Sequence, residues 1–314
     1  MKKYINSISG IALALLLISF VTFSLMNFSA DDPITMKMQA LGANVDPALI
    51  EQLREEAGLN RPFFVRYFDW LGQVLQGNLG QSIFFGAPVA ELMGEALPKT
   101  LILVLVAAIL SALISLPASL YASLHHNSVS DYFIRILSMI GISLPSFWVA
   151  LLLMYVFALE LQWLSVTNNE GVEGIILPAL TLAIWVSGLY IRRLRASFLE
   201  ELGKDYIVGA RALGLSEKKI IFSYLVPNGI LSILPMLGVT IGVLLGGATI
   251  IETIFGWRGI GYLMVQGIIS RDYPLMQGYI LWAASIYIAI NCLMDFLIAK
   301  LVPSSLLCKG GADE

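Results

Sequence analysis

The feature that most constrains this chain is a set of six stretches, each 17 to 25 residues long, that contain no charged residue. An α-helix needs about 20 consecutive apolar residues to cross the hydrocarbon core of a bilayer. Only 13% of the 314 residues are charged, whereas soluble domains carry about 25%. We therefore expect an all-α integral membrane protein with six transmembrane helices, at Ile11–Phe28, Thr100–Leu124, Ile136–Leu159, Ile175–Ile191, Asn228–Ile251 and Tyr273–Met294.

The distribution of Lys and Arg predicts the orientation of these helices. With the N-terminus inside, the inner segments hold twelve basic residues and the outer segments hold seven. Cytoplasmic loops carry the excess of positive charge, so both termini are expected in the cytoplasm. The first apolar stretch has a poor signal-peptidase site at Asn27–Asp31, so we interpret it as an uncleaved first helix rather than a signal peptide.

The polar segments divide the chain further. Residues 1–28 hold the cytoplasmic N-terminus and the first helix, 99–303 form the transmembrane core, and 304–314 form a cytoplasmic tail. Residues 29–98 carry nine acidic and four basic side chains and are expected to form an extracytoplasmic helical subdomain. A helix capped by Asp46 and ended by Gly58, and a second helix over Arg61–Leu75, are predicted there. The acidity is more typical of a solvated face than of a ligand site.

The longest patterned polar insert lies between the fourth and fifth stretches, and residues 204–222 are predicted to form a pair of short helices there. Asp205 can cap a helix over Tyr206–Leu213, and Gly214 can end it in a left-handed conformation. Ser216 can cap the next helix. The small side chains Ala210 and Ala212 would let a partner approach closely, while Lys218 and Lys219 would also suit a lipid surface. The residues by themselves leave docking and lipid contact equally open.

Prolines and glycines mark the apolar stretches. Pro117, Pro145, Pro178 and Pro235 lie inside or near the ends of helices, and each can kink a helix because it lacks an amide donor. Gly238, Gly242 and Gly246 share one helical face, which allows another backbone to approach. This face indicates static helix packing or a pore-lining helix, and packing is the more common use.

The chain carries no recognisable catalytic or metal-binding pattern. It contains no phosphate-binding Gly-rich loop with Lys, no His-Glu-x-x-His helix, no nucleophile elbow and no cluster of His, Cys or Met. The predicted helices hold almost no ionisable residue, unlike ion-coupled carriers, and only Glu252 and Asp295 lie near their ends. The net charge of −3 indicates no nucleic-acid partner. We therefore expect no enzyme, no catalytic residue, no metal site and no cofactor on this chain, and an energy source on another one.

From about Lys3 to Pro303 the chain resembles the permease subunits of bacterial ABC importers for di- and oligopeptides and nickel. The resemblance rests on the order of several motifs: Gly77–Ser82, Ser143–Trp148, Ile176–Ala179, Asp205–Leu215, Val226-Pro227, Glu252–Gly261 and Arg271–Pro274. Two departures occur, because Ala30–Pro33 lacks a glycine of the usual Pro-Gly-Asp-Pro and the tail reads Val302-Pro-Ser304 where Asp-Pro-Arg is usual. Val208-Gly209-Ala210 stands where the general coupling motif has Glu-Ala-Ala, so the role of that Glu does not transfer.

The resemblance implies a six-helix permease of the bacterial inner membrane, embedded in lipid. Its expected partners are a second homologous permease, two ATPase subunits that bind ATP and Mg, and an extracytoplasmic binding protein. It implies that ATPase coupling is carried by Asp205, Tyr206, Ala210, Arg211, Ala212, Gly214 and Leu215. Candidates for pore lining or packing are Gly238, Gly242, Gly246, Pro145 and Pro235. The short loop Glu160–Gly174 favours nickel or a metal chelate slightly over peptides. The alternative is an ion-coupled carrier or channel that works without an ATPase.

Overall fold

The fold is all-α in the part of the chain that the structure, a computed structural model, describes: residues 2–27, 35, 47–56, 60–164 and 171–301. Within these ranges the chain forms helices joined by short turns, together with one isolated antiparallel bridge between Gln81 and Pro88. The predicted N-cap Asp46 and helix end Gly58 lie outside the described residues, as does the tail 304–314. The predicted helical class is confirmed.

Five described helices are long and apolar enough to cross a membrane. They correspond to the first, second, fourth, fifth and sixth predicted stretches, and their bounds are α1 Lys2–Asn27, α5 Val89–Leu124, α8 Gly171–Leu202, α12 Leu234–Phe255 and α14 Tyr273–Leu301. The stretch Ile175–Ile191, short for a span, gains its length from flanking residues on both sides. Pro178 lies inside α8 without ending it.

The third predicted stretch is broken rather than straight. α6 spans Val129–Ser143, α7 spans Ser146–Met154, and a π-helical turn η1 continues over Tyr155–Glu160. The two parts meet at an angle of 104° and make a sixth span if the bent pair counts as one. Pro145 causes the break, because the residue before a proline avoids the helical conformation and Leu144 is extended, with ψ 133°.

Shorter helices connect these spans. α3 covers Pro47–Glu56 and α4 covers Phe63–Leu75, close to the predicted pair. The fifth stretch, predicted from Asn228, begins with α11 Val226–Ile230 and a 3₁₀ turn η3 Leu231–Ile233. α12 begins after this turn, with Pro235 among its first residues. The first amides of a helix have no partner within the helix, so a proline there removes no helical hydrogen bond. An apolar helix α13, Ile260–Ile269, is not among the predicted elements.

The chain forms two compact units, and the divisions between them fall inside or next to long helices. The larger unit, Thr100–Arg258 with Ala289–Glu314, is built around α8, which packs against α6, α7, α11 and α12. Its core includes Leu182, Val186, Leu194 and Phe198 of α8. Gly188 allows α6 to come close, because a Cβ at this position would lie 2.7 Å from the carbonyl oxygen of Ser138.

The smaller unit, Met1–Lys99 with Gly259–Ile288, is held together by a buried carboxylate. Asp272 is fully buried; it accepts hydrogen bonds from the Ser82 hydroxyl at 2.5 Å and from the backbone amides of Phe84 at 3.0 Å and Leu275 at 3.3 Å. A buried charge must be paired or hydrogen-bonded to be tolerated. Asp272 therefore fixes the segment after α4 to the turn between α13 and α14.

Candidate coupling site

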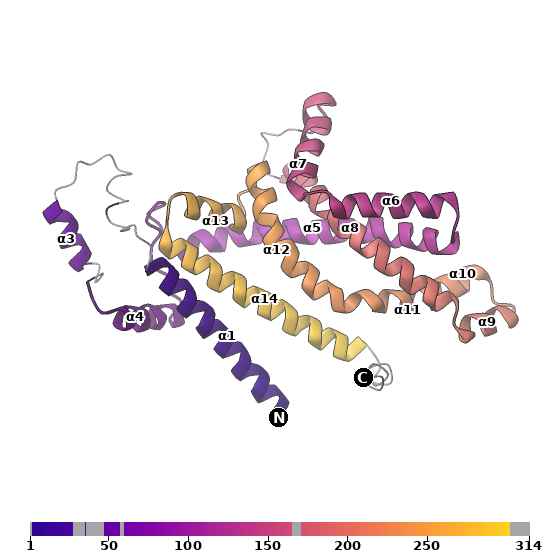
Figure 1. The fold of residues 1–314 in the computed structure, drawn as a ribbon, viewed down its shortest axis with the longest axis horizontal. Coiled ribbons are helices and arrows are strands. Elements are labelled where there is room, and N and C mark those ends of the chain that lie inside the picture. The colour runs from indigo at the N-terminus through magenta and orange to yellow at the C-terminus, as the bar shows by residue number, and fades with distance from the viewer. Residues whose placement is uncertain (1, 28–34, 36–46, 57–59, 165–170, 302–314) are drawn as a thin grey trace. The chain divides into compact units, whose positions relative to one another are not determined.

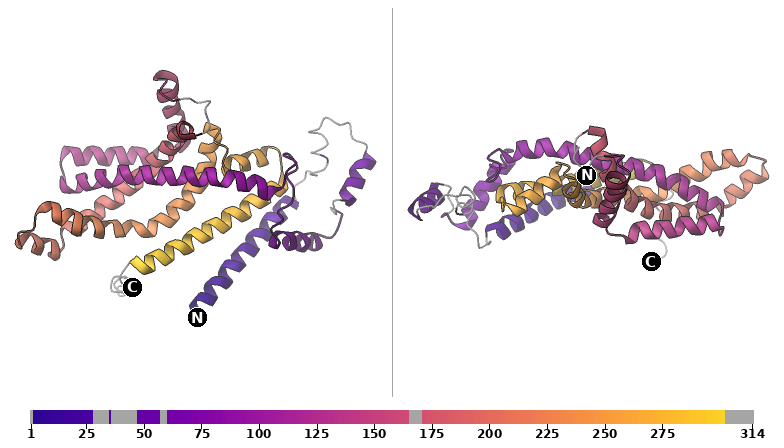
Figure 2. Two further views of the ribbon diagram at one scale, coloured as in Figure 1. Left: turned by 180° about the vertical axis from the view of Figure 1, so that it is seen from behind. Right: turned by 90° about the horizontal axis from the view of Figure 1, so that it is seen from above.

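The insert after α8 forms two short helices joined by a glycine turn, visible at one end of α8 in Figures 1 and 2. α9 spans Asp205–Ala212 and α10 spans Glu217–Ile220. Gly214 has a φ of 76°, and its amide donates to the Arg211 carbonyl at 3.0 Å while that of Leu215 donates to Ala210 at 3.2 Å. These two bonds form a Schellman motif. The predicted left-handed ending at Gly214 is confirmed.

The starts of both helices differ from the prediction. Asp205, predicted as the N-cap, is the first helical residue, and Lys204 holds the N-cap position with extended backbone and no capping hydrogen bond. The Asp205 carboxylate still suits the first turn, where the helix dipole favours negative charge. Ser216 occupies the predicted N-cap position of α10, but its side chain forms no capping bond.

The pair of helices has a small core of its own. Ile207, Ala210 and Ile220 are buried together, with Leu215 and the Tyr224 ring packed against them. Ala210 thus faces this core and not a partner, whereas Asp205 and Ala212 are exposed. Burial of one face leaves several large apolar side chains on the other side, namely Val208, Leu213 and Phe222, of which Leu213 is 83% exposed. Such exposed apolar side chains on a locally packed element are typical of a protein interface.

Tyr206 attaches α9 to the neighbouring helices. Its hydroxyl donates to the carboxylate of Glu201 at the end of α8 and accepts from the Asn228 amide at 3.3 Å. Lys204 also pairs with Glu201, at 2.5 Å. Burial, followed by the hydrogen bond to Glu201 and then by the negative charge of Glu201, raises the pKa of Tyr206 to about 12. The hydroxyl therefore keeps its proton at neutral pH and connects α8, α9 and α11.

Arg211 points along the turn. Its guanidinium pairs with the Glu217 carboxylate at 2.8 Å and so closes the turn around Gly214. Hydrogen bonding to Arg211 lowers the pKa of Glu217, and the same bond raises the pKa of Arg211. Both side chains are about half exposed, so this pair contributes little to stability. Its main effect is to set the direction in which α10 leaves α9.

A buried ion pair holds α8 to α6 near the same end of α8. Arg195 donates to both carboxylate oxygens of Asp131, each at 2.6 Å, through Nε and Nη2, and the same Nη2 lies 3.0 Å from Nδ1 of His126. Asp131 is fully buried and also accepts the Asn127 amide. A bidentate ion pair whose carboxylate accepts a further hydrogen bond is the geometry that best offsets the cost of burying charge. This contact is not predicted, because its two residues are 64 positions apart.

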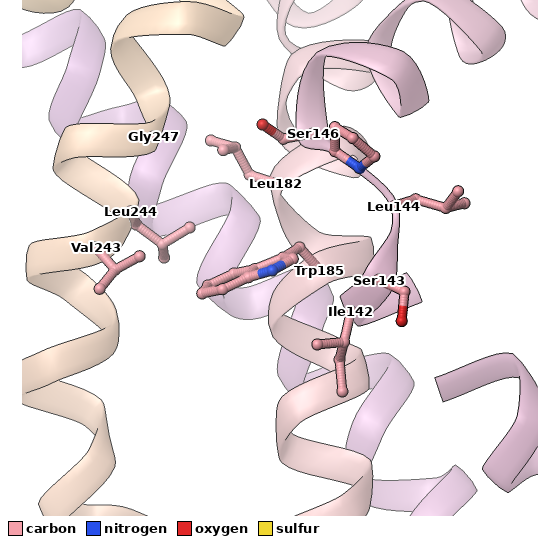
Figure 3. Close-up of a pocket in the computed structure, with 10 residues that line it drawn as sticks. Ile142, Ser143, Leu144, Ser146, Leu182, Trp185, Val243, Leu244 and Gly247 are labelled. Carbon is pink, nitrogen blue, oxygen red and sulfur yellow. The ribbon is translucent and has the colours of Figure 1, made fainter. Parts of the chain in front are cut away.

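A cavity of about 360 Å³ lies at the break between α6 and α7. Figure 3 shows the Trp185 ring between this break and α12. Hydroxyl groups come only from Ser143 and Ser146, and the rest of the lining is apolar: Ile142, Leu144, Pro145, Leu182, Trp185, Val243, Leu244 and Gly247. Of the predicted pore or packing residues, Pro145 thus lines this cavity. The volume is within the range of small-molecule pockets, about 300–1,000 Å³.

The glycine face of α12 serves more than one purpose. A Cβ at Gly238 would lie 3.2 Å from both Asn291 and Met294 of α14, so Gly238 allows two helices to pack closely. At Gly246 a Cβ would meet nothing within 4 Å, and Gly242 is only partly buried. Pro235 starts α12.

Across the described ranges, no three His, Cys, Asp or Glu side chains are grouped so that they could hold a metal ion.

Most of the sequence matches models of one protein family. Residues 115–305 match the family described as binding-protein-dependent transport system inner membrane component, and residues 1–104 match its N-terminal model. A putative peptide permease protein of Brucella ovis is 34% identical over 94% of both chains. The glutathione transport system permease protein GsiC of Escherichia coli is 31% identical over 96% of this chain and 97% of that protein. The metal-staphylopine import system permease protein CntB of Staphylococcus aureus is 32% identical over 92% and 93%.

The fold is similar to that of a chain in inward-facing structures of the MetNI methionine ABC transporter. The match has a TM-score of 0.58 at 16% identity and covers 68% of this chain and 97% of that one. The family match and the permeases named above, together with the apolar helices, confirm the expected multi-pass inner membrane protein and a transport subunit in place of an enzyme. The chain belongs to the family of inner membrane components of binding-protein-dependent transport systems, with the ABC importer permeases that its motifs resemble.

Proposed function

We propose that this chain forms the translocation path of an ATP-driven importer together with a second homologous permease. Two ATPase subunits that carry ATP and Mg, and an extracytoplasmic binding protein, complete the complex. The observation that supports this proposal best is the packing of α9 and α10, together with the π-helical turn η2 Ile221–Leu225 that follows them, around a core of their own, which leaves Val208, Leu213 and Phe222 exposed. The lipid-surface alternative accounts less well for an ordered Schellman turn that the Arg211–Glu217 pair closes.

The contacts of Tyr206 suggest how movement of the ATPase would reach the membrane helices. A rigid docked element moves as one body, and α9 is joined to α8 by Glu201 and to α11 by Asn228. α8 in turn packs on α6, α7 and α12. Closure of the ATPase dimer would therefore shift the helices around the cavity and alternate access between the two sides.

For the cargo we propose a small organic solute, either a di- or oligopeptide or a metal chelate such as nickel in complex. The relatives are named for peptide, glutathione and metal-staphylopine, so they support this class without separating its members. The largely apolar lining of the cavity suits an organic solute better than a bare hydrated ion, because apolar walls cannot replace the water bound to a cation. We therefore propose a metal chelate or a peptide as the cargo rather than a free nickel ion.

The test is uptake by the complex reconstituted in vesicles with its cognate binding protein. Labelled dipeptides, glutathione, a nickel chelate and free Ni²⁺ are offered with ATP or with an imposed proton or sodium gradient. We expect uptake of one of the organic solutes with ATP only. Uptake that a gradient drives without ATP would favour the secondary carrier, and uptake of free Ni²⁺ alone would contradict the cargo class.

A further inference from the structure

α4 carries more apolar surface than its contacts within the described chain use. One face packs on α1: Phe63, Tyr67 and Trp70 surround Phe23, with ring centroids 5.4–5.5 Å apart. A second apolar face lies beside the first, because Phe64, Phe68 and Leu75 recur at helical spacing. These three side chains are 62%, 63% and 80% exposed. Asp69 and Gln73 form the opposite, polar side of the helix.

α4 crosses α1 steeply and does not run along it. Phe63, Tyr67 and Trp70 span two turns of α4, yet all three contact one ring of α1, that of Phe23. The adjacent residues Arg66 and Tyr67, in contrast, reach positions on α1 that are eight residues apart. Two parallel helices would pair residues at equal spacing along both. α1 is the first membrane span, so a helix that crosses it steeply lies close to the membrane plane. Figures 1 and 2 show α4 beside the C-terminal end of α1 and inclined to it.

The crossing point lies below the end of the span. Phe23 is four residues before Asn27, the last residue of α1, which corresponds to about 6 Å along a helix axis. Helices that lie in the membrane interface bury their apolar face about 5–10 Å into the boundary between headgroups and acyl chains. The depth of α4 on α1 therefore matches an interfacial position.

Two hydrogen bonds show which side of α4 faces the membrane interior. Arg66 donates to the Asn27 side chain at 3.0 Å, at the end of the span. Tyr67 bonds in the other direction, to the Ser19 hydroxyl at 2.9 Å, about 12 Å deeper along α1. Phe64 and Phe68 lie on the Tyr67 side of the helix and Asp69 and Gln73 on the Arg66 side. The exposed phenylalanines thus face the hydrocarbon, and the polar residues face water.

We propose that α4 is an interfacial helix that lies in the leaflet at the C-terminal end of α1, with Phe64, Phe68 and Leu75 in contact with lipid acyl chains. Lipid is the occupant that the geometry favours, because the exposed apolar side chains Leu13 and Leu16 lie on the same side of α1 as Phe20 and continue this surface one to two turns deeper. The segment predicted as an extracytoplasmic subdomain would thereby be anchored to the membrane surface. The inference requires only that α1 spans the bilayer, so it stands apart from the transport proposal.

Spin-label accessibility in the full complex tests this position. The two natural cysteines are replaced by serine, and single labels are placed through Phe68→Cys and Gln73→Cys, with Leu17→Cys as a reference inside the lipid. The complex is reconstituted in vesicles of phosphatidylethanolamine and phosphatidylglycerol without binding protein. Oxygen, which concentrates in lipid, and chromium oxalate, which stays in water, are the two probes. Leu75→Cys replaces Phe68→Cys if the latter does not assemble.

We expect the label at position 68 to be relaxed by oxygen far more than by chromium oxalate, as at position 17, and the label at 73 to show the reverse. Equal access of chromium oxalate to positions 68 and 73 would overturn the proposal in favour of a water-exposed surface. A label at 68 that neither probe reaches would overturn it in favour of a covering protein partner.

Discussion

Gly214 is the residue on which the shape of the coupling element depends. Its φ of 76° costs a residue with a Cβ about 1–2 kcal/mol, and a misdirected turn would move α10 away from the ATPase. We expect Gly214→Val to insert and assemble but to lose transport and substrate-stimulated ATP hydrolysis. Gly171→Val is the matched control, because Gly171 has a similar φ of 72° and open space but lies at the other end of α8. Wild-type hydrolysis in Gly214→Val would reject the coupling role and favour the lipid-surface interpretation.

The hydroxyl of Tyr206 should matter more than its ring. Tyr206→Phe keeps the ring, which lies 6.5 Å from that of Tyr224, but removes the bonds to Glu201 and Asn228. The loss of a hydrogen bond to a charged partner costs about 1.5–3 kcal/mol when buried, and less here because Tyr206 is 39% exposed. We expect unchanged basal hydrolysis with fewer solutes transported per ATP. Tyr224→Phe is the control, and equal losses in both variants would point to general destabilisation.

At the scale of the element, Arg211 has two separable roles. Arg211→Glu would repel Glu217 and open the turn, and it would also reverse a charge near the proposed interface. The double variant Arg211→Glu with Glu217→Arg restores the ion pair with the charges exchanged. We expect the single variant to lose stimulated hydrolysis and the double variant to recover it if the turn is what matters. Failure of the double variant, measured in the same assay, would instead assign Arg211 to direct contact with the ATPase.

The same pair should give no pH dependence near neutrality. The pKa of Glu217 is lowered, so its contribution is present above the ordinary carboxyl pKa of about 4.3 and is lost only as the pH falls through the lowered value. Between about pH 6 and 8 both partners are charged. Stimulated hydrolysis by Arg211→Lys should therefore follow the wild-type pH profile in this range. A difference between the two profiles there would mean that another group titrates in the coupling element.

The cavity at the α6–α7 break offers a test of the translocation path. Trp185→Ala would widen it, because the Trp185 ring forms one of its walls. If solute passes here, we expect a raised KM for uptake with normal basal hydrolysis. Trp148→Ala is the control, since Trp148 lies nearby on α7 but is 45% exposed and outside the lining. An unchanged KM in Trp185→Ala would place the path elsewhere, for example between the two permeases.

The elements differ in how well the sequence predicts them, for physical reasons. The left-handed turn at Gly214 and the break at Pro145 follow from local backbone restrictions, so the sequence alone is sufficient to predict both. α13 is missed because its 10 residues are too short to register as a span. The contacts of Asp272, Asp131 and Tyr206 are missed because each depends on residues far away in the chain or on another helix. The helix α4 is predicted, but hydropathy does not reveal its second apolar face, because Arg66 and Asp69 interrupt the apolar residues along the sequence.

At the scale of the whole molecule, the prediction that both termini are cytoplasmic is tested best at two described, exposed positions. Gln81 follows α4 and Lys219 lies in α10. The path from Gln81 to Lys219 crosses the membrane through α5, the bent pair α6–α7 and α8, which is three crossings. The two positions must therefore lie on opposite sides if the bent pair spans, and on the same side if it is re-entrant.

In a background without the natural cysteines, Gln81→Cys and Lys219→Cys are exposed to an impermeant maleimide. In intact spheroplasts we expect Gln81→Cys to react and Lys219→Cys to react only after permeabilisation, because the basic residues favour α9 and α10 inside. Reaction of Lys219→Cys alone would invert the orientation and remove α10 from any cytoplasmic ATPase. Reaction of both would mean that the 104° bend of α6 and α7 returns the chain to the side it came from, leaving five spans in place of six.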